Sequence, residues 1–485
     1  MELANIQPKP SFSKENSVDP WELTAQRYGT PEMVQIWGAE RTFEYSLRVQ
    51  GLSAEILSQF YPELVPPEHA REISGRATLQ FVNKDRIREI EAAKGHDVFG
   101  ICGALEEALT IPEARAQVNL AKTSADTTQP ARVMQLKQAF EVIAESVENL
   151  RDILIEKSVS WRDVPHMDTT HLYDALPTVA GRPLSHYVEM LQSGLDRLAY
   201  TYHNSLMGKW SDATGNYHSA TVLGLDGVAL ERELCDRLGV KSMIAAAQLP
   251  GLEYELDVFF SLARLGETMN NLARYIAWGR GDDVNIFVNA SPTRKKGSSA
   301  MPHKDSKNGN PTAEEQTMSL RNYLAGTLVT AMLNCQITYA RDLSASANSR
   351  INLEGAFKFS DHVIRSLANQ VYWIKLKEER CKERVDRSYG VVCSQAVMSY
   401  LTDARHTSNP MARSQAHDLM GRLATQAWES RTPFIEVVIT EAEVTSRLDV
   451  ATLRSITDPY QYIGKSKNII DRVANAFYQK KTLAL

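Results

Sequence analysis

Residues 281–311 carry side chains that could bind an anion and do acid–base chemistry. The segment, GDDVNIFVNASPTRKKGSSAMPHKDSKNGNP, has no helical or strand period and is rich in small residues. Cations gather around Gly297, Ser298 and Ser299, namely Arg294, Lys295, Lys296, Lys304 and Lys307. A long irregular segment inside a compact chain is typical of a lid, a binding loop or disorder, and the same composition also suits a solvated linker. Because clustered cations attract anions, we expect an anionic small-molecule substrate here.

Composition and charge narrow the class of protein. The 485 residues are 43% hydrophobic and 23% charged, which is typical of a globular chain with two or three domains. The net charge of −5 gives no general basic surface for nucleic acid. No apolar run approaches the ~18 residues that a membrane-spanning helix needs, and residues 1–20 lack the apolar core of a signal peptide. We therefore expect a cytoplasmic protein that binds neither nucleic acid nor membrane.

The cysteines favour no disulfide framework and no metal site. Their number is odd, they are widely scattered, and they form no CxxC pair and no metal-ligand spacing with histidines. We expect all of them to be reduced: Cys102, Cys235, Cys335, Cys381 and Cys393.

Helical periodicity extends over most of the chain. Apolar residues recur at spacings of three and four in residues 136–154, in residues 262–276, and after Pro311 in Tyr323, Leu324, Leu328, Met332 and Leu333. Such stripes predict bundle helices whose apolar residues pack in a core. Thr312 and Glu315 predict a capping box at the start of the third helix. The irregular segment 281–311 therefore bridges two long helices.

Strand signals are few and short, so the sequence predicts an all-α fold. We place one domain boundary in the polar segment at residues 123–130 and another at the end of the helical run near residue 370. The predicted domains are 1–121, a central long-helix bundle at 122–372 that includes the segment 281–311, and 373–485. The charged run LKEERCKERVDR at 376–387 is interpreted as a solvated helix face.

Eight consecutive residues, GSSAMPHK at 297–304, resemble the signature loop of the adenylosuccinate lyases, in the fumarase/aspartase superfamily. Similar short motifs cover most of the chain in the family's order: RYGTPEM at 27–33, HDV at 96–98, TSAD at 123–126, TH at 170–171, GNY at 215–217 and RDLSAS at 341–346. The resemblance implies three mainly helical domains and a homotetramer with shared active sites. It also implies a lyase that cleaves adenylosuccinate to AMP and fumarate, and the related succinyl-aminoimidazole-carboxamide ribotide, without a metal or organic cofactor.

The resemblance also implies roles for individual residues. Ser298 is the expected general base, His171 the general acid, His96 a residue at the substrate, and Lys304 the cation that stabilises the developing negative charge. The residues implied at the nucleotide phosphate are Arg27, Tyr28, Arg341, Ser346 and Arg350. The residues implied at the rest of the substrate are Thr123, Ser124, Asp126, Thr170, Asn216, Gln248, Ser299, Met301, Asn308 and Asn310.

The chemistry of releasing fumarate from a succinyl-amine suits these residue types. A proton leaves a weakly acidic carbon beside a carboxylate, negative charge grows on that carboxylate, and the departing nitrogen gains a proton. Serine becomes a base only where solvent is excluded and where cations and backbone N–H groups favour its ionised form. An imidazole titrates near 6.5 and can donate a proton at working pH. Guanidinium groups make bidentate bonds to a phosphate dianion.

Departures from the family pattern leave the substrate open. Thr169 replaces an arginine of the family pattern, and Tyr173 replaces a glutamine. The segment between Lys304 and Asn310 is about four residues longer than in the family pattern. This spacing matters because a small displacement of a reacting group lowers the reaction rate. Either Asn308 or Asn310 could contact the substrate. One alternative is a fumarate-releasing lyase that acts on a non-nucleotide succinyl or nitrosuccinyl compound. Another is a non-catalytic scaffold like the crystallins of this superfamily.

Overall fold

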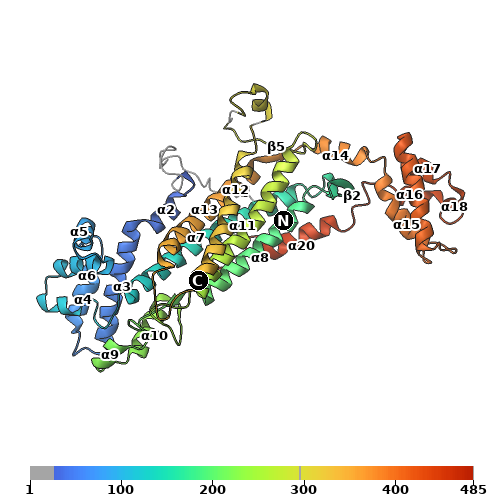
Figure 1. Ribbon diagram of the computed structural model, residues 1–485. Coiled ribbons are helices and arrows are strands. Elements are labelled where there is room, and N and C mark those ends of the chain that lie inside the picture. Colours follow the sequence, from blue (N-terminus) through green and yellow to red (C-terminus); the bar gives the residue numbers. More distant parts are fainter. Residues whose placement is uncertain (1–26, 294–296, 308, 484–485) are drawn as a thin grey trace.

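The computed structural model describes residues 27–293, 297–307 and 309–483, and helices dominate it (Figure 1). Its centre is a bundle of long helices that share one hydrophobic core. These helices are α7 (Ala125–Ser160), α8 (Arg182–Asn204), α11 (Glu253–Arg280), α12 (Thr312–Asn334) and α13 (Ser346–Trp373). The all-α fold with a long central bundle, which the sequence predicted, is confirmed.

The apolar stripes explain how the bundle forms, with one exception. Every stripe residue between Leu136 and Leu154 on α7, and between Leu262 and Ile276 on α11, is buried. On α12, Leu324 is buried, but Met332 and Leu333 are 57% and 61% exposed, so the predicted core stripe is wrong at that end. The predicted capping box is also wrong, because α12 begins after Pro311 without a side-chain cap. A helical period shows which residues share a face, but not whether this chain covers that face.

Two smaller hydrophobic clusters flank the bundle core. The first joins the N-terminal helices with Trp210 and α10 (Gly227–Leu238), and the second lies within residues 397–453. The last helix, α20 (Ser466–Phe477), returns to pack on α7 and α8. The domain limits at 121 and 372 therefore stay a prediction, because segments on both sides of them cross between clusters.

Local sequence signals set the ends of several flanking helices. Asn83 caps α5 (Lys84–Lys94) through its side chain, and Gly95 ends it with a φ of 68°, as expected for an N-cap amide and a C-terminal glycine. The other N-terminal helices are α2 (Pro31–Trp37), α3 (Ala39–Phe60), α4 (Pro67–Arg76), α6 (Asp97–Ala108) and η2 (Pro112–Gln117). The remaining short helices are α9 (His218–Val222), η3 (Pro302–Lys307), α14 (Glu378–Asp386), η4 (Val391–Cys393), α15 (Ser394–Thr402), α16 (Arg413–Ser430), α17 (Phe434–Val438), α18 (Ala442–Thr445) and α19 (Val450–Ile456).

Strands in the described residues form three two-stranded sheets. β1 (Pro165–Thr170) and β2 (Tyr173–Val179) make an antiparallel hairpin that packs against α14. β3 (Met207–Gly208) pairs with β4 (Lys241–Ser242) in parallel. β5 (Phe287–Asn289) pairs with β6 (Ile374–Leu376), which attaches the start of the segment 281–311 to the far end of α13.

The run at 376–387 is not simply a solvated helix face. Within α14, Cys381 and Val385 are buried and the Arg384 side chain is only 3% exposed. The interpretation as a solvated face is wrong for these positions, because the β1–β2 hairpin covers one side of the helix.

The cysteines are reduced, as the sequence predicted. All five cysteines are free, and four of them are buried. In the part of the chain that the structure describes, no helix has both the length and the apolar character needed to cross a bilayer.

Candidate functional site

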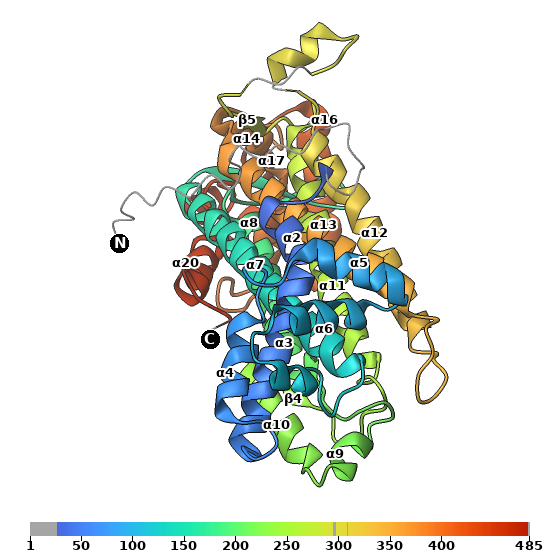
Figure 2. The same cartoon turned by 90° about the vertical axis from the view of Figure 1, so that its left-hand side faces the viewer.

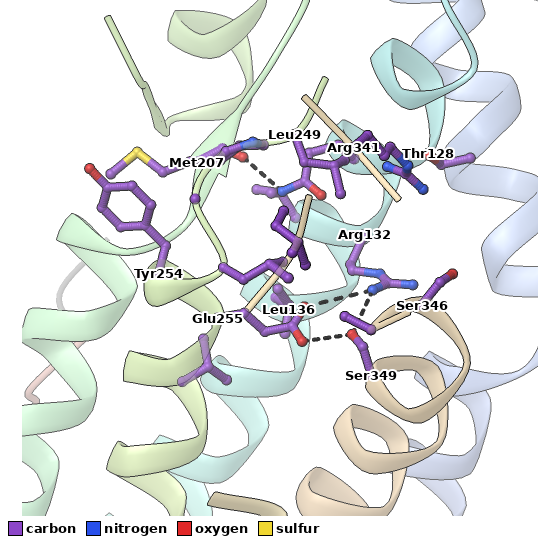
Figure 3. Close-up of a pocket in the computed structure, with 18 of the residues that line it drawn as sticks. Thr128, Arg132, Leu136, Met207, Leu249, Tyr254, Glu255, Arg341, Ser346 and Ser349 are labelled. Carbon is purple, nitrogen blue, oxygen red and sulfur yellow. Dashed lines mark hydrogen bonds and ion pairs between the residues drawn. The ribbon is translucent and has the colours of Figure 1, made fainter. Parts of the chain in front are cut away.

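An arginine-lined pocket lies between the first turns of α7, α11 and α13 (Figure 3). Arg341, Ser346 and Arg350, three of the residues expected at a phosphate, line it together. Ser346 begins the 28-residue helix α13, so the positive end of that helix dipole faces the same region. Nη1 of Arg341 is buried and has no hydrogen-bond partner in the described structure. The pocket therefore offers cationic donors to an anion.

Sequence reasoning missed a third arginine in this pocket, Arg132 on α7. Its Nη1 donates to Oγ of Ser349 at 3.2 Å and lies 3.8 Å from Oε2 of Glu255, whose Oε1 accepts from Ser349 at 2.6 Å (Figure 3). Burial lowers the pKa of Arg132, and the cations Arg350 and Arg341 lower it further against the effect of Glu255. One signal could have revealed it: Arg132 stands four residues before Leu136, in register with the apolar stripe of α7.

The N-terminal helices contribute His96 and Asp97 beside this pocket. A carboxylate oxygen of Asp97 lies 3.8 Å from Nη2 of Arg350. His96 is the N-cap of α6, where Nδ1 accepts from the backbone N–H of Val98 at 3.2 Å, and its ring stays partly exposed. The structure thus brings His96 close to the arginine group.

None of the TSAD residues lines the arginine pocket, and Asp126 is turned into the interior. Asp126 has no exposed side-chain surface and pairs with the equally buried Lys209. Its carboxylate also accepts backbone N–H groups of Ser211, Asp212 and Thr123, the last at 2.8 Å. Asp126 therefore organises the chain around it, while Thr123 and its neighbour Ser124, the first residues of this turn, stay partly exposed.

Asn216 and Gln248 lie on two loops that pack tightly together. At Gly215 the backbone has a φ of 76°, and a Cβ there would lie 1.8 Å from the carbonyl oxygen of Ala246, so only glycine fits. Asn216 is exposed, and Gln248 precedes Leu249, which lines the arginine pocket. These two expected substrate residues therefore belong to the same end of the bundle as the arginines.

The signature loop holds Ser298 and Lys304 in one compact turn. A Cβ on Gly297 would lie 2.6 Å from the backbone of Lys304, so glycine permits this approach. Oγ of Ser298 accepts the backbone N–H groups of Ala300 and Met301 at 3.2 and 3.1 Å. Such donors stabilise the ionised form of the hydroxyl.

The loop stands away from the bundle in both views and is anchored at its base (Figures 1 and 2). Arg280, at the end of α11, pairs with the buried Glu314 at 2.8 Å and donates to the carbonyl of Gly309 at 3.2 Å. Ser299, Met301 and Asn310 are exposed on the loop. Arg294, Lys295, Lys296 and Asn308 lie outside the described residues.

His171 lies at the tip of the β1–β2 hairpin. Thr170 pairs with Tyr173 across the strands, which leaves His171 and Leu172 as a two-residue turn. Thr170 and His171 are exposed, and so are Leu172 and Tyr173, at 85% and 79%. The expected acid therefore projects outward from this chain.

Arg27 and Tyr28 do not join the other expected phosphate ligands within one chain. The Tyr28 ring meets Phe359 and His362 edge-on, at centroid distances of 6.4 and 5.4 Å, and Arg27 is exposed. Phe359 follows Arg350 by nine residues on α13, which is about 14 Å along a helix.

The expected site residues thus form groups at different ends of the bundle (Figure 1). The arginine pocket lies at the start of α13, while the loop is attached beside its last residue, where the N–H of Ala290 donates to the carbonyl of Trp373 at 2.9 Å. The 28 residues between them span about 40 Å. One chain alone does not bring Ser298 to the arginines.

Known proteins resemble this chain in sequence and in fold. A family model described as "Lyase" matches residues 27–324, which is more than half of the chain, and one described as "Adenylosuccinate lyase C-terminus" matches residues 390–473. The adenylosuccinate lyase of Bacillus subtilis is 29% identical over 92% of this chain and 97% of its own. That of Methanocaldococcus jannaschii is 25% identical over 94% and 96%.

Solved structures agree on the fold. A fumarate lyase from Mesorhizobium superposes with a TM-score of 0.78 at 20% identity, over 92% of this chain and 98% of its own. The 3-carboxy-cis,cis-muconate lactonizing enzyme of Pseudomonas putida also gives 0.78, at 19% identity over 93% and 98%. With the family matches, the helical bundle and the signature loop taken together, the chain belongs to the lyase family, in the adenylosuccinate lyase branch of the fumarase/aspartase superfamily, and is a carbon–nitrogen lyase.

Proposed function

We propose that this enzyme cleaves adenylosuccinate to AMP and fumarate, and the succinyl-aminoimidazole-carboxamide ribotide in the same way. The observation that carries the nucleotide assignment is the arginine pocket, where Arg132, Arg341 and Arg350 meet at the start of α13. A phosphate dianion suits three guanidinium groups and a helix N-terminus. The likeness to curated adenylosuccinate lyases over more than nine-tenths of the chain supports the same substrate.

The elimination uses one base and one acid. Ser298 takes a proton from the carbon next to a succinyl carboxylate, and the electrons of that C–H bond form the double bond of fumarate. The C–N bond breaks, and the departing nitrogen takes a proton from His171. Lys304 stabilises the negative charge that grows on the carboxylate. The two N–H groups at Oγ of Ser298 support its role, because they favour the ionised hydroxyl.

We further propose that a complete site is built from more than one copy of the chain, as in the homotetramer that the family likeness implies. Two observations support an assembly. The arginine pocket and the loop are separated by the length of α13, and apolar side chains are exposed on α12 at Val329, Met332 and Leu333. Contiguous exposed apolar residues of this kind typically mark an interface between proteins.

Phosphate dependence tests the substrate. Fumarate release, followed by ultraviolet absorbance, is compared for adenylosuccinate and for its phosphate-free nucleoside. Arg341→Ala and Arg350→Ala should each raise the KM for adenylosuccinate about 10- to 100-fold, because a charge-assisted bond contributes about 1.5–3 kcal/mol. The phosphate-free compound should be little affected. Arg197→Ala, an exposed arginine on α8, is the control.

Other outcomes would select another function. An unchanged KM for adenylosuccinate in both variants would contradict the nucleotide assignment. Fumarate release from a succinyl or nitrosuccinyl compound without a nucleotide would favour a lyase of the same superfamily with a non-nucleotide substrate. Tyr173 and the longer segment after Lys304 are the sequence features that favour this alternative. Absence of fumarate from every substrate would favour a scaffold.

A further inference from the structure

The turn that carries His171 is strained. His171 and Leu172 have φ values of 52° and 69°, both in the left-handed region. A two-residue hairpin turn with both residues at positive φ favours Asn-Gly, because most side chains clash in that conformation. Histidine and leucine are therefore costly choices, and such backbone strain persists only where the surrounding structure over-determines it.

The side chains at the tip give the turn little support of their own. Leu172 is 85% exposed and Tyr173 is 79% exposed, so neither packs into this chain. The next residue, Asp174, is different, because its side chain is only 20% exposed and both of its carboxylate oxygens are bound. Support for the turn therefore begins at Asp174.

Asp174 is held by two arginines from the segment that follows the bundle. Its Oδ1 accepts from Nη2 of Arg384 at 2.5 Å. Its Oδ2 accepts from Nε and Nη2 of Arg387 at 3.0 and 2.6 Å. Charge-assisted bonds of this kind are strong and directional. They fasten the hairpin, at the second residue of β2, to α14 and to the residue that follows this helix.

Arg384 is itself fixed in place. Its side chain is 3% exposed, and its guanidinium lies over the ring of Trp278 on α11, 5.3 Å from the ring centroid. His166 on β1 is buried nearby, and burial, with the adjacent Arg384, lowers its pKa to about 3. The histidine therefore stays neutral at working pH and adds no second cation beside Arg384.

We propose that Asp174 is a positioning residue for the elimination: clamped by Arg384 and Arg387, it fixes the strained turn and aims His171 out of the hairpin. This inference rests on the proposed role of His171 as the acid. Through this clamp a segment outside the central bundle would affect the activity, because Arg384 lies on α14 and Arg387 is the residue that directly follows it. A displacement of about 1 Å at a reacting group can cost orders of magnitude in rate.

Asp174→Asn tests the clamp, since it removes the charge and keeps the size. We expect kcat on adenylosuccinate to fall about tenfold or more with little change in KM, because the acid is misplaced while ground-state binding is kept. Asp174→Glu should regain part of the activity. The matched control is Asp403→Asn, which removes a carboxylate that also takes Nε and Nη2 of one arginine, Arg405, away from the hairpin.

A second measurement does not depend on the substrate. Amide hydrogen exchange of residues 165–179 should be faster in Asp174→Asn than in the wild type or the control. Arg387→Gln, at an exposed position, should give a smaller change of the same kind and serves if Asp174→Asn does not fold. Unchanged exchange in the hairpin, or an unchanged kcat, would overturn the inference. A wild type without activity on adenylosuccinate would instead overturn the proposed function, and hydrogen exchange would still decide on the clamp.

Discussion

The two ends of the central bundle are built differently. At the start of α13, Arg132 lies on a long helix and is already paired with Glu255 and Ser349 inside one chain. At the other end, Ser298 belongs to the loop 297–304, which stands away from the bundle, and His171 is exposed at the tip of the β1–β2 hairpin. Groups on packed helices are held rigidly, whereas groups on loops depend on further contacts. In the proposed mechanism, one end of each chain would bind the substrate and the other end would supply the base and the acid.

The largest expected effect separates chemistry from binding. Ser298→Ala should lower kcat by about 10³-fold, within the range for loss of a general base. The affinity for AMP, measured by calorimetry, should stay close to that of the wild type, because the arginine pocket is untouched. Thr293→Ala, an exposed position on the same segment 281–311 with no assigned role, is the matched control. Undiminished turnover in Ser298→Ala would remove the proposed mechanism.

Mixing two impaired variants, assayed at an adenylosuccinate concentration well below the KM of Arg350→Ala, sharpens the comparison. Ser298→Ala damages the loop end and Arg350→Ala damages the arginine pocket. If each site takes its base and its arginines from different copies, subunits exchanged between the two variants should form some sites with both groups intact. We expect fumarate release to rise well above that of either variant alone after dissociation and reassembly. A mixture no more active than the average of the two separate variants would mean that both groups come from the same copy.

The smallest expected effect concerns the fastening of the hairpin. His166 has a folded pKa of about 3, below its ordinary value near 6.5. Between these values the unfolded chain binds a proton that the folded chain does not, so the free energy of unfolding falls as pH falls below about 6.5. At pH 5 the loss should be about 2 kcal/mol, at 1.36 kcal/mol for each pH unit.

Denaturant unfolding between pH 7 and 5 measures this loss. His166→Gln should lack this part of the acid destabilisation, whatever its stability at neutral pH. His417→Gln, at an exposed position, should keep it. Equal slopes against pH in the two variants would show that His166 does not couple the hairpin to pH.

Much of the helical architecture could be predicted from periodicity. The stripes on α7 and α11 are buried as expected, because a helix in a bundle must cover its apolar face. The end of α12 was predicted wrongly, because a stripe does not tell whether this chain or another protein covers it. The charged run at 376–387 was predicted to be solvated, but Arg384 within it is buried, because a hairpin far from it in sequence covers it.

For the candidate site, the sequence by itself determined the signature loop, the motif residues and the family, because short runs of particular residue types are written locally. Only the tertiary structure decided which of them meet. It joined Arg132 to Arg341 and Arg350, turned Asp126 inward to Lys209, and connected Asp174 to Arg384 across 210 residues. The physical reason is that helix lengths and packing, which act over tens of ångströms, set the distances between groups, and no local pattern contains those distances.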